Sequence, residues 1–311
     1  MKTVLFFDPN LNERGTSIAA YDYAHYNETI LGNKSIIASY KNAGKISYNR
    51  FADRFGEVHL VDSFSEIDTL CEKKEVYGVH ILKYGHKDNQ IVNSAKNLVH
   101  VVFPAFDPHG DVYTYISKWL ANQCGGIQST FVPHMVNLPD TNSNYRELLH
   151  LENKLIVGWY GGDNFEIAYA RQAVINAAKE RSDIVFIFMN QQPFCDLPNV
   201  LFFNATTDME EKVAFINTCD VMIHARERGE TFGLAIAEFS TRNKPVITCH
   251  NAPERNHIET LGERGIYYKD YKSLYNILVN IKHPDLEGDW NCYREFTPEA
   301  VMDKFNKIFL L

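Results

Sequence analysis

Short apolar runs alternate with longer, partly polar segments along the first half of the chain. Runs of this kind, ended by polar or turn residues, are typical of strands buried on both faces of a parallel sheet. We predict strands at 3–7, 35–38, 58–61, 78–82, 98–103 and 129–133 and helices at 16–31, 46–55, 65–75 and 113–122. Strands and helices that alternate at this spacing indicate βαβ units and a mostly parallel sheet.

The pattern restarts in the second half, after the polar segment 138–153 (LPDTNSNYRELLHLEN), which we interpret as a linker. The predicted strands are 155–159, 184–189, 200–203, 221–224, 246–249 and 266–268, and the predicted helices are 165–181, 209–217, 232–241, 254–261, 272–281 and 298–308. We therefore expect two Rossmann-like domains, 1–145 and 146–296, with the C-terminal helix 297–311 joined to the first.

Two doubly wound parallel sheets in one chain predict an α/β protein whose two domains face a central cleft. In open sheets of this class, ligands bind beyond the carboxyl ends of the strands, near the point where the strand order reverses. We expect that edge to be formed by the loops that follow Phe7, Phe103, Trp159, Met189, Phe203 and His224. The polar residues that can bind or react cluster in the same loops.

Composition narrows the class of protein but does not identify its chemistry. The chain of 311 residues is 45% hydrophobic and 23% charged, as in ordinary soluble proteins. Its net charge of −8 disfavours nucleic acid as a partner. No apolar run approaches the ~20 residues of a membrane span, which disfavours stable membrane insertion. The six cysteines are scattered without a C-x-x-C pair, which fits a soluble cytoplasmic protein. The sequence does not indicate an oligomeric state.

One stretch, Cys219–Pro245, carries most of the candidate chemistry: CDVMIHARERGETFGLAIAEFSTRNKP. A buried-looking strand is followed by a polar turn with two arginines and two glutamates, and then by an apolar helix. That helix holds one carboxylate, Glu238, near its middle. A carboxylate buried without hydrogen bonds is costly, so Glu238 needs a partner. Glu230, in the turn, completes an E-x7-E spacing that is weak evidence by itself.

In this context the stretch resembles the retaining GT-B glycosyltransferases of family four. Their signature is a Glu, a Phe-Gly-Leu or similar segment, a small apolar segment, a second Glu, and a Pro-Val at the next strand. Val221–Thr248 matches it, and the segments 132–139 (VPHMVNLP) and 115–117 (YIS) extend the resemblance loosely over most of the chain. The resemblance implies the GT-B fold, with the acceptor on the first domain and the nucleotide-sugar donor on the second.

The resemblance also implies separate roles for the two glutamates. Glu238 is expected to bind the two ribose hydroxyls of the nucleotide, since a carboxylate accepts hydrogen bonds from a vicinal diol. Glu230 is expected to be catalytic and to contact the donor sugar near the reacting centre. Backbone N–H groups of Phe232, Gly233 and Leu234, at the predicted start of a helix, suit the diphosphate. The structural alternatives are a capping acid for Glu230 and a solvated carboxylate for Glu238.

The usual phosphate-binding pair of the family is missing. The family commonly has an Arg just after a glycine at this strand end and a Lys some residues later, whereas the sequence from Gly158 reads GWYGGD with no nearby lysine. Arg226 and Arg228, in the turn ahead of Glu230, are the expected substitutes, with Arg171 behind them. Arg226 is therefore an expected catalytic residue and Arg228 an expected donor-binding residue. Surface ion pairs are the alternative for both.

Other expected site residues fall at the predicted strand ends. Gly161 and Gly162 can let phosphates approach the backbone, and Asn190 is expected to border the nucleotide. The remaining candidates are His224 on the donor side, His109 as a catalytic residue, and Gly15 and Thr16 on the acceptor side. Ordinary loop positions without a functional role are the alternative for each of them.

The sequence predicts a retaining glycosyltransferase of the hexosyltransferase type that needs no metal or other cofactor. Its donor is a nucleotide-diphosphate sugar and its acceptor a hydroxyl group of a carbohydrate or other soluble molecule. No D-x-D, P-loop, G-x-S-x-G or H-E-x-x-H sequence occurs, which disfavours metal-dependent transferases, NTPases, hydrolases and zinc proteases. The alternatives are a sugar-nucleotide epimerase or hydrolase on the same scaffold, and a non-catalytic nucleotide-sugar binder.

Overall fold

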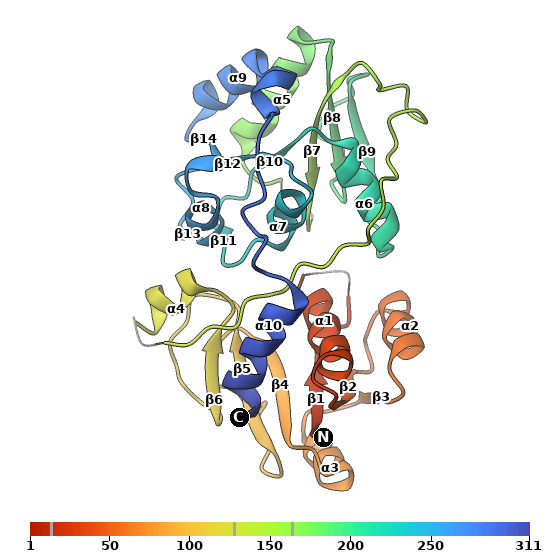
Figure 1. The fold of residues 1–311 in the computed structure, drawn as a ribbon, viewed down its shortest axis with the longest axis vertical. Helices are drawn as coiled ribbons and strands as arrows, with labels where there is room; N and C mark the ends of the chain where they lie inside the picture. Colours follow the sequence, from red (N-terminus) through yellow and green to blue (C-terminus); the bar gives the residue numbers. More distant parts are fainter. Residues whose placement is uncertain (13–14, 127–128, 163–164) are drawn as a thin grey trace. The chain divides into compact units, whose positions relative to one another are not determined.

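The computed structural model describes residues 1–12, 15–126, 129–162 and 165–311. These residues form two compact units (Figure 1). The first consists of Met1–Met135 together with Glu295–Leu311, and the second of Val136–Arg294. Each unit is built around its own six-stranded sheet, in which all described strand pairs are parallel.

The sheet of the first unit has the strand order β3-β2-β1-β4-β5-β6. Its strands are β1 (Thr3–Phe7), β2 (Lys34–Tyr40), β3 (Val58–Val61), β4 (Gly78–Lys83), β5 (Lys96–Val101) and β6 (Val112–Tyr115). The central strands are nearly continuous in apolar residues because helices cover both faces of such a sheet. Five predicted strands of this half therefore lie within two residues of the apolar runs. The strand predicted at 129–133 is wrong, because only Phe131 forms an isolated bridge, with Tyr115.

Five helices belong to the described part of the first unit. They are α1 (Gly15–Thr29), α2 (Lys45–Arg54), α3 (Ser65–Lys74), α4 (Lys118–Cys124) and α10 (Pro298–Phe305), which continues into a π-helical turn, η3 (Asn306–Leu310). Helix α10 lies beside α1 although the two are at opposite ends of the chain (Figure 1). The Tyr77 hydroxyl donates to the Leu310 carbonyl over 3.1 Å, and Lys2 Nζ contacts the same oxygen. The C-terminal segment is thus held in the first unit.

The helix predicted at 113–122 is wrong over its first part. Val112–Tyr115 forms the edge strand β6, which pairs with β5, and the helix α4 begins only at Lys118. The sequence VYTY is β-branched and aromatic, which favours a strand. Ser117 then caps α4, because its side chain accepts a hydrogen bond from the Leu120 amide.

The sheet of the second unit has the order β14-β12-β10-β7-β8-β9. Its strands are β7 (Leu155–Tyr160), β8 (Ile184–Met189), β9 (Val200–Phe203), β10 (Val221–His224), β12 (Val246–Cys249) and β14 (Ile266–Tyr268). The chain adds β8 and β9 on one side of β7 and then crosses to add β10, β12 and β14 on the other. The strand order therefore reverses between β7 and β10, which is where ligands bind in open α/β sheets.

The second unit also contains helices and one short extra ladder. The helices are α5 (Ala168–Glu180), α6 (Met209–Thr218), α7 (Leu234–Thr241), α8 (Asn256–Leu261) and α9 (Tyr271–Asn280), with 3₁₀ turns η1 (Gly262–Arg264) and η2 (His283–Leu286). The ladder is formed by β11 (Gly229–Glu230) and β13 (Glu254–Arg255). Right-handed crossovers put α5 and α6 on opposite faces of the sheet, because the direction of strand addition reverses between them.

The segment 138–153, interpreted as a linker, contains turns but no helix or strand. It is attached to the second unit by specific contacts. Arg146 Nη2 lies 2.6 Å from Asp220 Oδ1, and the Tyr145 amide donates to the Thr218 hydroxyl over 2.8 Å. Within the described residues, every helix is too short or too polar to cross a bilayer.

Candidate functional site

Glu230 is the centre of a hydrogen-bonded group at the end of β10. Its Oε1 lies 3.1 Å from His224 Nε2, and its Oε2 accepts from Arg226 Nη1 over 2.9 Å. Burial alone would raise the pKa of the Glu230 carboxyl, but the hydrogen bond from His224 and the charge of Arg226 lower it to about 2. Glu230 is therefore an ionised carboxylate with a fixed orientation.

His224 is itself held in place by the next two strands of the sheet. Its Nδ1 lies 2.9 Å from the Thr248 hydroxyl on β12. The Tyr268 hydroxyl, on β14, donates to the His224 carbonyl over 2.8 Å. These contacts fix both the ring and the backbone of His224, so the orientation of Glu230 depends on residues of three strands.

Two glycines let the chain pass close to this group. Gly229 has φ +76°, and a Cβ there would lie 2.1 Å from the Glu254 carbonyl oxygen. Gly233 has φ +90°, and a Cβ there would lie 3.2 Å from Glu230 Cβ. Both positions need glycine for the left-handed backbone and for the close approach. The buried ring of His257 lies 5.2 Å from the His224 ring, and burial together with His224 lowers the pKa of His257 to about 3.

Helix α7 begins four residues after Glu230. Its N-cap is Gly233 and its first residue is Leu234, two residues later than the predicted start at 232. Phe232 is held by its carbonyl oxygen, which accepts from Asn256 Nδ2 over 2.9 Å. The first N–H groups of a helix have no partner within the helix, and they carry the positive end of its dipole. This arrangement puts anion-binding backbone groups beside the ionised Glu230.

Glu238, in α7, forms an enclosed ion pair that the sequence analysis did not predict. Its Oε1 accepts from Lys212 Nζ, in α6, over 3.0 Å. Only 4% of the Glu238 side chain and 1% of the Lys212 side chain are exposed. The Lys212 ammonium also lies 5.0 Å from the ring centroid of Tyr160, the last residue of β7. The partner that the buried carboxylate needed is therefore a lysine of the chain itself.

The two arginines of the turn contact different carboxylates. Arg226 binds Glu230, whereas Arg228 Nε and Nη2 lie 3.0 Å and 2.9 Å from Glu254 Oε1. Burial raises the pKa of Glu254, although Arg228 acts in the opposite direction. The Arg228 side chain is 61% exposed, so much of its guanidinium faces solvent. Arg226 is thus part of the Glu230 group and Arg228 is not.

The expected nucleotide-side loops meet at the ends of two neighbouring strands. Asn190 follows β8, has φ +61°, and donates from Nδ2 to the Gly161 carbonyl over 2.9 Å. Gly161 follows β7, and the next residue, Gly162, is exposed. These three residues therefore form one connected surface at the carboxyl edge of the sheet. Their roles in binding remain predictions.

His109, Gly15 and Thr16 belong to the first unit. His109 Nδ1 lies 2.7 Å from the Asp107 carbonyl oxygen, so it donates to that oxygen, and Nε2 lies 3.3 Å from Lys83 Nζ. Both ring nitrogens of His109 are therefore engaged within its own unit. Gly15 and Thr16 are the first residues of α1. Their predicted catalytic and acceptor-side roles remain predictions.

The sequence analysis missed several residues that support the site. They are Thr248, Tyr268 and Lys212. Thr248 had the weak signal of a polar side chain in an otherwise apolar strand. The sequence did not indicate a role for Lys212, because a lysine that follows two glutamates in the helix MEEKVAFINT is expected to face solvent.

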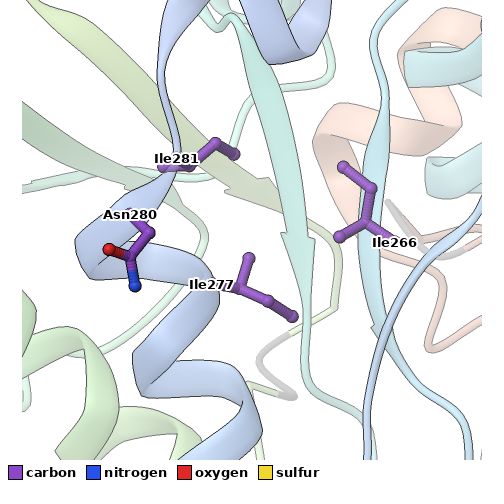
Figure 2. Close-up of a pocket in the computed structure, with 4 residues that line it drawn as sticks. All are labelled: Ile266, Ile277, Asn280 and Ile281. Atoms are coloured by element: carbon purple, nitrogen blue, oxygen red, sulfur yellow. The ribbon is translucent and has the colours of Figure 1, made fainter.

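A hollow of about 240 Å³ lies elsewhere in the second unit, between β14 and the end of α9 (Figure 2). It is lined by Ile266, Ile277, Asn280 and Ile281. None of these four side chains can act as an acid, a base or a nucleophile, so we assign the hollow no chemistry. Within the described ranges, no three His, Cys, Asp or Glu side chains gather in a metal-binding arrangement.

No protein-family model and no curated protein matches the sequence. Solved structures do match it over almost the whole chain. HepE from Anabaena, in complex with UDP-glucose, is 12% identical with a TM-score of 0.72, and the match covers 100% of both chains. A glycosyltransferase from Rickettsia africae is 14% identical with a TM-score of 0.68, over 99% of this chain and 97% of that one.

A third similar structure comes from Listeria monocytogenes and is assigned as a UDP-N-acetylglucosamine 2-epimerase. It is 14% identical with a TM-score of 0.62, over 97% of this chain and 94% of that one. Sequence identities this low show a similar fold and nothing more. The two doubly wound parallel sheets and the match over the full length show that this chain has the GT-B fold.

Proposed function

We propose that this protein is a retaining, metal-independent glycosyltransferase that moves a sugar from a nucleotide-diphosphate donor to a hydroxyl acceptor. The observation that carries the proposal is the group around Glu230. An ionised carboxylate, an arginine and the N-terminus of a helix lie together beyond β10, beside the point where the strand order reverses. Ligands of open α/β sheets bind at this point.

The proposed reaction needs stabilisation of two opposite charges. As the bond between sugar and diphosphate breaks, negative charge grows on the leaving diphosphate and positive charge on the sugar. The first amides of α7 and the guanidinium of Arg226 are suited to the diphosphate. The Glu230 carboxylate is suited to the donor sugar, and its two fixed oxygens need no reorganisation during the reaction. No protein nucleophile is required if the acceptor attacks from the face that the diphosphate leaves.

A uridine nucleotide is the donor class that we propose to test first. HepE, which has the same fold, has been crystallised with UDP-glucose and with UDP. We propose that Glu238 binds the ribose, that Asn190 and Gly161 border the base, and that Arg228 and Gly162 contribute to the phosphate side. His109, Gly15 and Thr16 are the residues that we propose for the acceptor side. The acceptor is a carbohydrate or another molecule with a free hydroxyl group.

A ligand screen followed by a transfer assay tests this proposal. A ligand at a hundred times its Kd stabilises a native protein by about 2.7 kcal/mol, which a thermal-shift measurement detects. We expect a nucleotide-diphosphate sugar to raise the melting temperature, in EDTA as well as in Mg²⁺. We then expect transfer of labelled sugar to a hydroxyl acceptor with retention of the anomeric configuration. If no nucleotide sugar shifts the melting temperature, the proposal is wrong.

A sugar-nucleotide epimerase is the second candidate, because the Listeria protein assigned to that reaction has the same fold. The two activities differ in their need for an acceptor. An epimerase converts the labelled donor to its epimer without an acceptor, whereas a transferase needs one and releases the nucleotide diphosphate. A hydrolase releases free sugar in water alone. Donor binding without any of these products would indicate a non-catalytic binder.

A further inference from the structure

Lys212 and Glu238 form an ion pair that is almost completely enclosed. The Nζ–Oε1 distance is 3.0 Å, and the exposed fractions of the two side chains are 1% and 4%. Burial alone would lower the pKa of Lys212, but the charge of Glu238 and the contact with Tyr160 raise it above its ordinary value. The Lys212 ammonium is therefore charged in the folded protein and lies directly against the Glu238 carboxyl group.

One oxygen of the Glu238 carboxylate lacks a hydrogen-bond partner. Glu238 Oε2 is buried and has no hydrogen-bond partner among the described residues. Enclosed charges are expensive to desolvate, and the cost is recovered only when the remaining lone pairs are also hydrogen-bonded. If the contact between α6 and α7 served stability alone, apolar side chains of similar volume would stabilise the fold at least as well. The unpartnered oxygen points instead to a hydrogen-bond donor that comes from a ligand.

The pair also lies in a position that a ligand can approach. Lys212 is in the first turn of α6, Glu238 is in α7, and both helices follow strands whose carboxyl ends form the ligand edge of the sheet. Tyr160, the last residue of β7, borders the pair and is only partly buried.

We propose that Lys212 is a positioning residue for nucleoside recognition, which holds one oxygen of Glu238 and leaves the other to accept a hydrogen bond from a ribose hydroxyl. The proposal rests on the proposed function, in which Glu238 faces the ribose. Lys212 does not touch the ligand. It holds the Glu238 carboxylate in one orientation, so the protein distinguishes ribose from deoxyribose through a single rigid acceptor.

Binding of two probes, UDP and 2′-deoxyuridine diphosphate, tests the proposal by calorimetry. We expect the wild-type protein to bind UDP about tenfold or more tightly than the deoxy compound, because the lost hydrogen bond is to a charged acceptor. We expect Lys212→Met to weaken UDP binding to the level of the deoxy compound, so that the ratio falls to about one. Lys212→Arg, which keeps the charge, should restore part of the ratio.

Lys244→Met is the matched control, since Lys244 is a second shielded lysine of the same unit whose Nζ lies 3.5 Å from the Asn217 carbonyl oxygen. It should keep the wild-type ratio. If Lys212→Met does not fold by circular dichroism, Lys212→Gln is measured in its place. A wild-type ratio in the folded Lys212 variant overturns the proposal. Wild-type binding of UDP without preference over the deoxy compound overturns it as well but leaves the nucleotide-sugar function standing, whereas no binding of any nucleotide overturns both.

Discussion

His224 and Glu230 lie 3.1 Å apart, from Nε2 to Oε1, and this contact joins the end of β10 to the short strand β11. Arg226 binds the second oxygen of the same carboxylate. With both oxygens occupied, Glu230 is a fixed negative charge rather than a proton donor or an attacking nucleophile. A retaining transfer that uses no protein nucleophile is consistent with this arrangement.

Glu230→Gln is expected to lower the turnover number of sugar transfer by about 10²–10³-fold, the usual effect of removing one fixed electrostatic group from an active site. The amide keeps the size of the side chain but loses its charge. Its NH₂ group can only donate, so it faces the donor of His224 or Arg226 without forming a hydrogen bond. Initial rates with a saturating donor measure the effect. Glu227→Gln is the control, because Glu227 is exposed and three residues away. Equal rates for the two variants would contradict the role of Glu230.

Arg226 and Arg228 offer a matched pair for the diphosphate site. Arg226→Lys should reduce the turnover number about tenfold or more. The planar guanidinium of arginine can contact Glu230 and a phosphate at the same time, whereas lysine has a single ammonium group in its place. Arg228→Lys should change it less than about threefold, since Arg228 is largely exposed and binds Glu254. Steady-state rates of both variants check the prediction. A larger loss for Arg228→Lys would reverse the assignment.

Gly233→Ala should damage the site more than the fold. A left-handed backbone costs an alanine about 1–2 kcal/mol, and here the added Cβ also presses on Glu230. Gly32→Ala is the control for the backbone cost, because Gly32 has φ +64° but nothing within 4 Å of the added Cβ. We expect similar losses of unfolding free energy in urea for both variants, with loss of transfer activity only in Gly233→Ala. Full activity of Gly233→Ala would show that the position of Glu230 is not critical.

The strands of both sheets could be predicted from the sequence because each is a short apolar run that helices cover on both faces. The strand at Ile184–Met189 is an example, since every residue in it is buried. The edge strand Val112–Tyr115 was harder, because an edge strand is only half-buried and its residues also fit the start of a helix. The capping residue Ser117 was the available signal for the true boundary.

The site could be predicted only in part. Glu230, Phe232–Leu234 and Glu238 belong to one continuous turn and helix. Their order along this segment could therefore be predicted without knowledge of the tertiary structure. The partners of these residues are not local: Lys212 and Thr248 lie 26 and 24 residues from the side chains that they contact. Pairings over such distances depend on how the strands are ordered in the sheet, and an amphipathic pattern does not contain that information.

A buried histidine cluster in the first unit leads to the last prediction. His80 Nε2 lies 3.1 Å from His100 Nδ1, and the ring of His134 lies 6.2 Å from that of His100. Rings of Tyr23 and Phe305 pack against His80. Burial lowers the pKa of His100 to about 4 and of His134 to about 3, and burial followed by the charge of His100 lowers that of His80 well below its usual value.

Because these pKa values are lower in the folded state than in the unfolded chain, the unfolded chain binds more protons below about pH 6.5. The histidines therefore stabilise the fold fully above pH 6.5, and stability falls as the pH drops towards 4, by up to about 1.4 kcal/mol per pH unit for each histidine. The pKa of Glu230 is lowered from 4.5 to about 2, so it adds a loss only below pH 4.5. Urea unfolding measured from about pH 7 to about pH 4.5 should show the first loss, and His134→Gln should make its slope shallower. A free energy of unfolding that stays constant down to pH 5 would contradict the prediction, because it would mean that these rings can be protonated inside the folded protein.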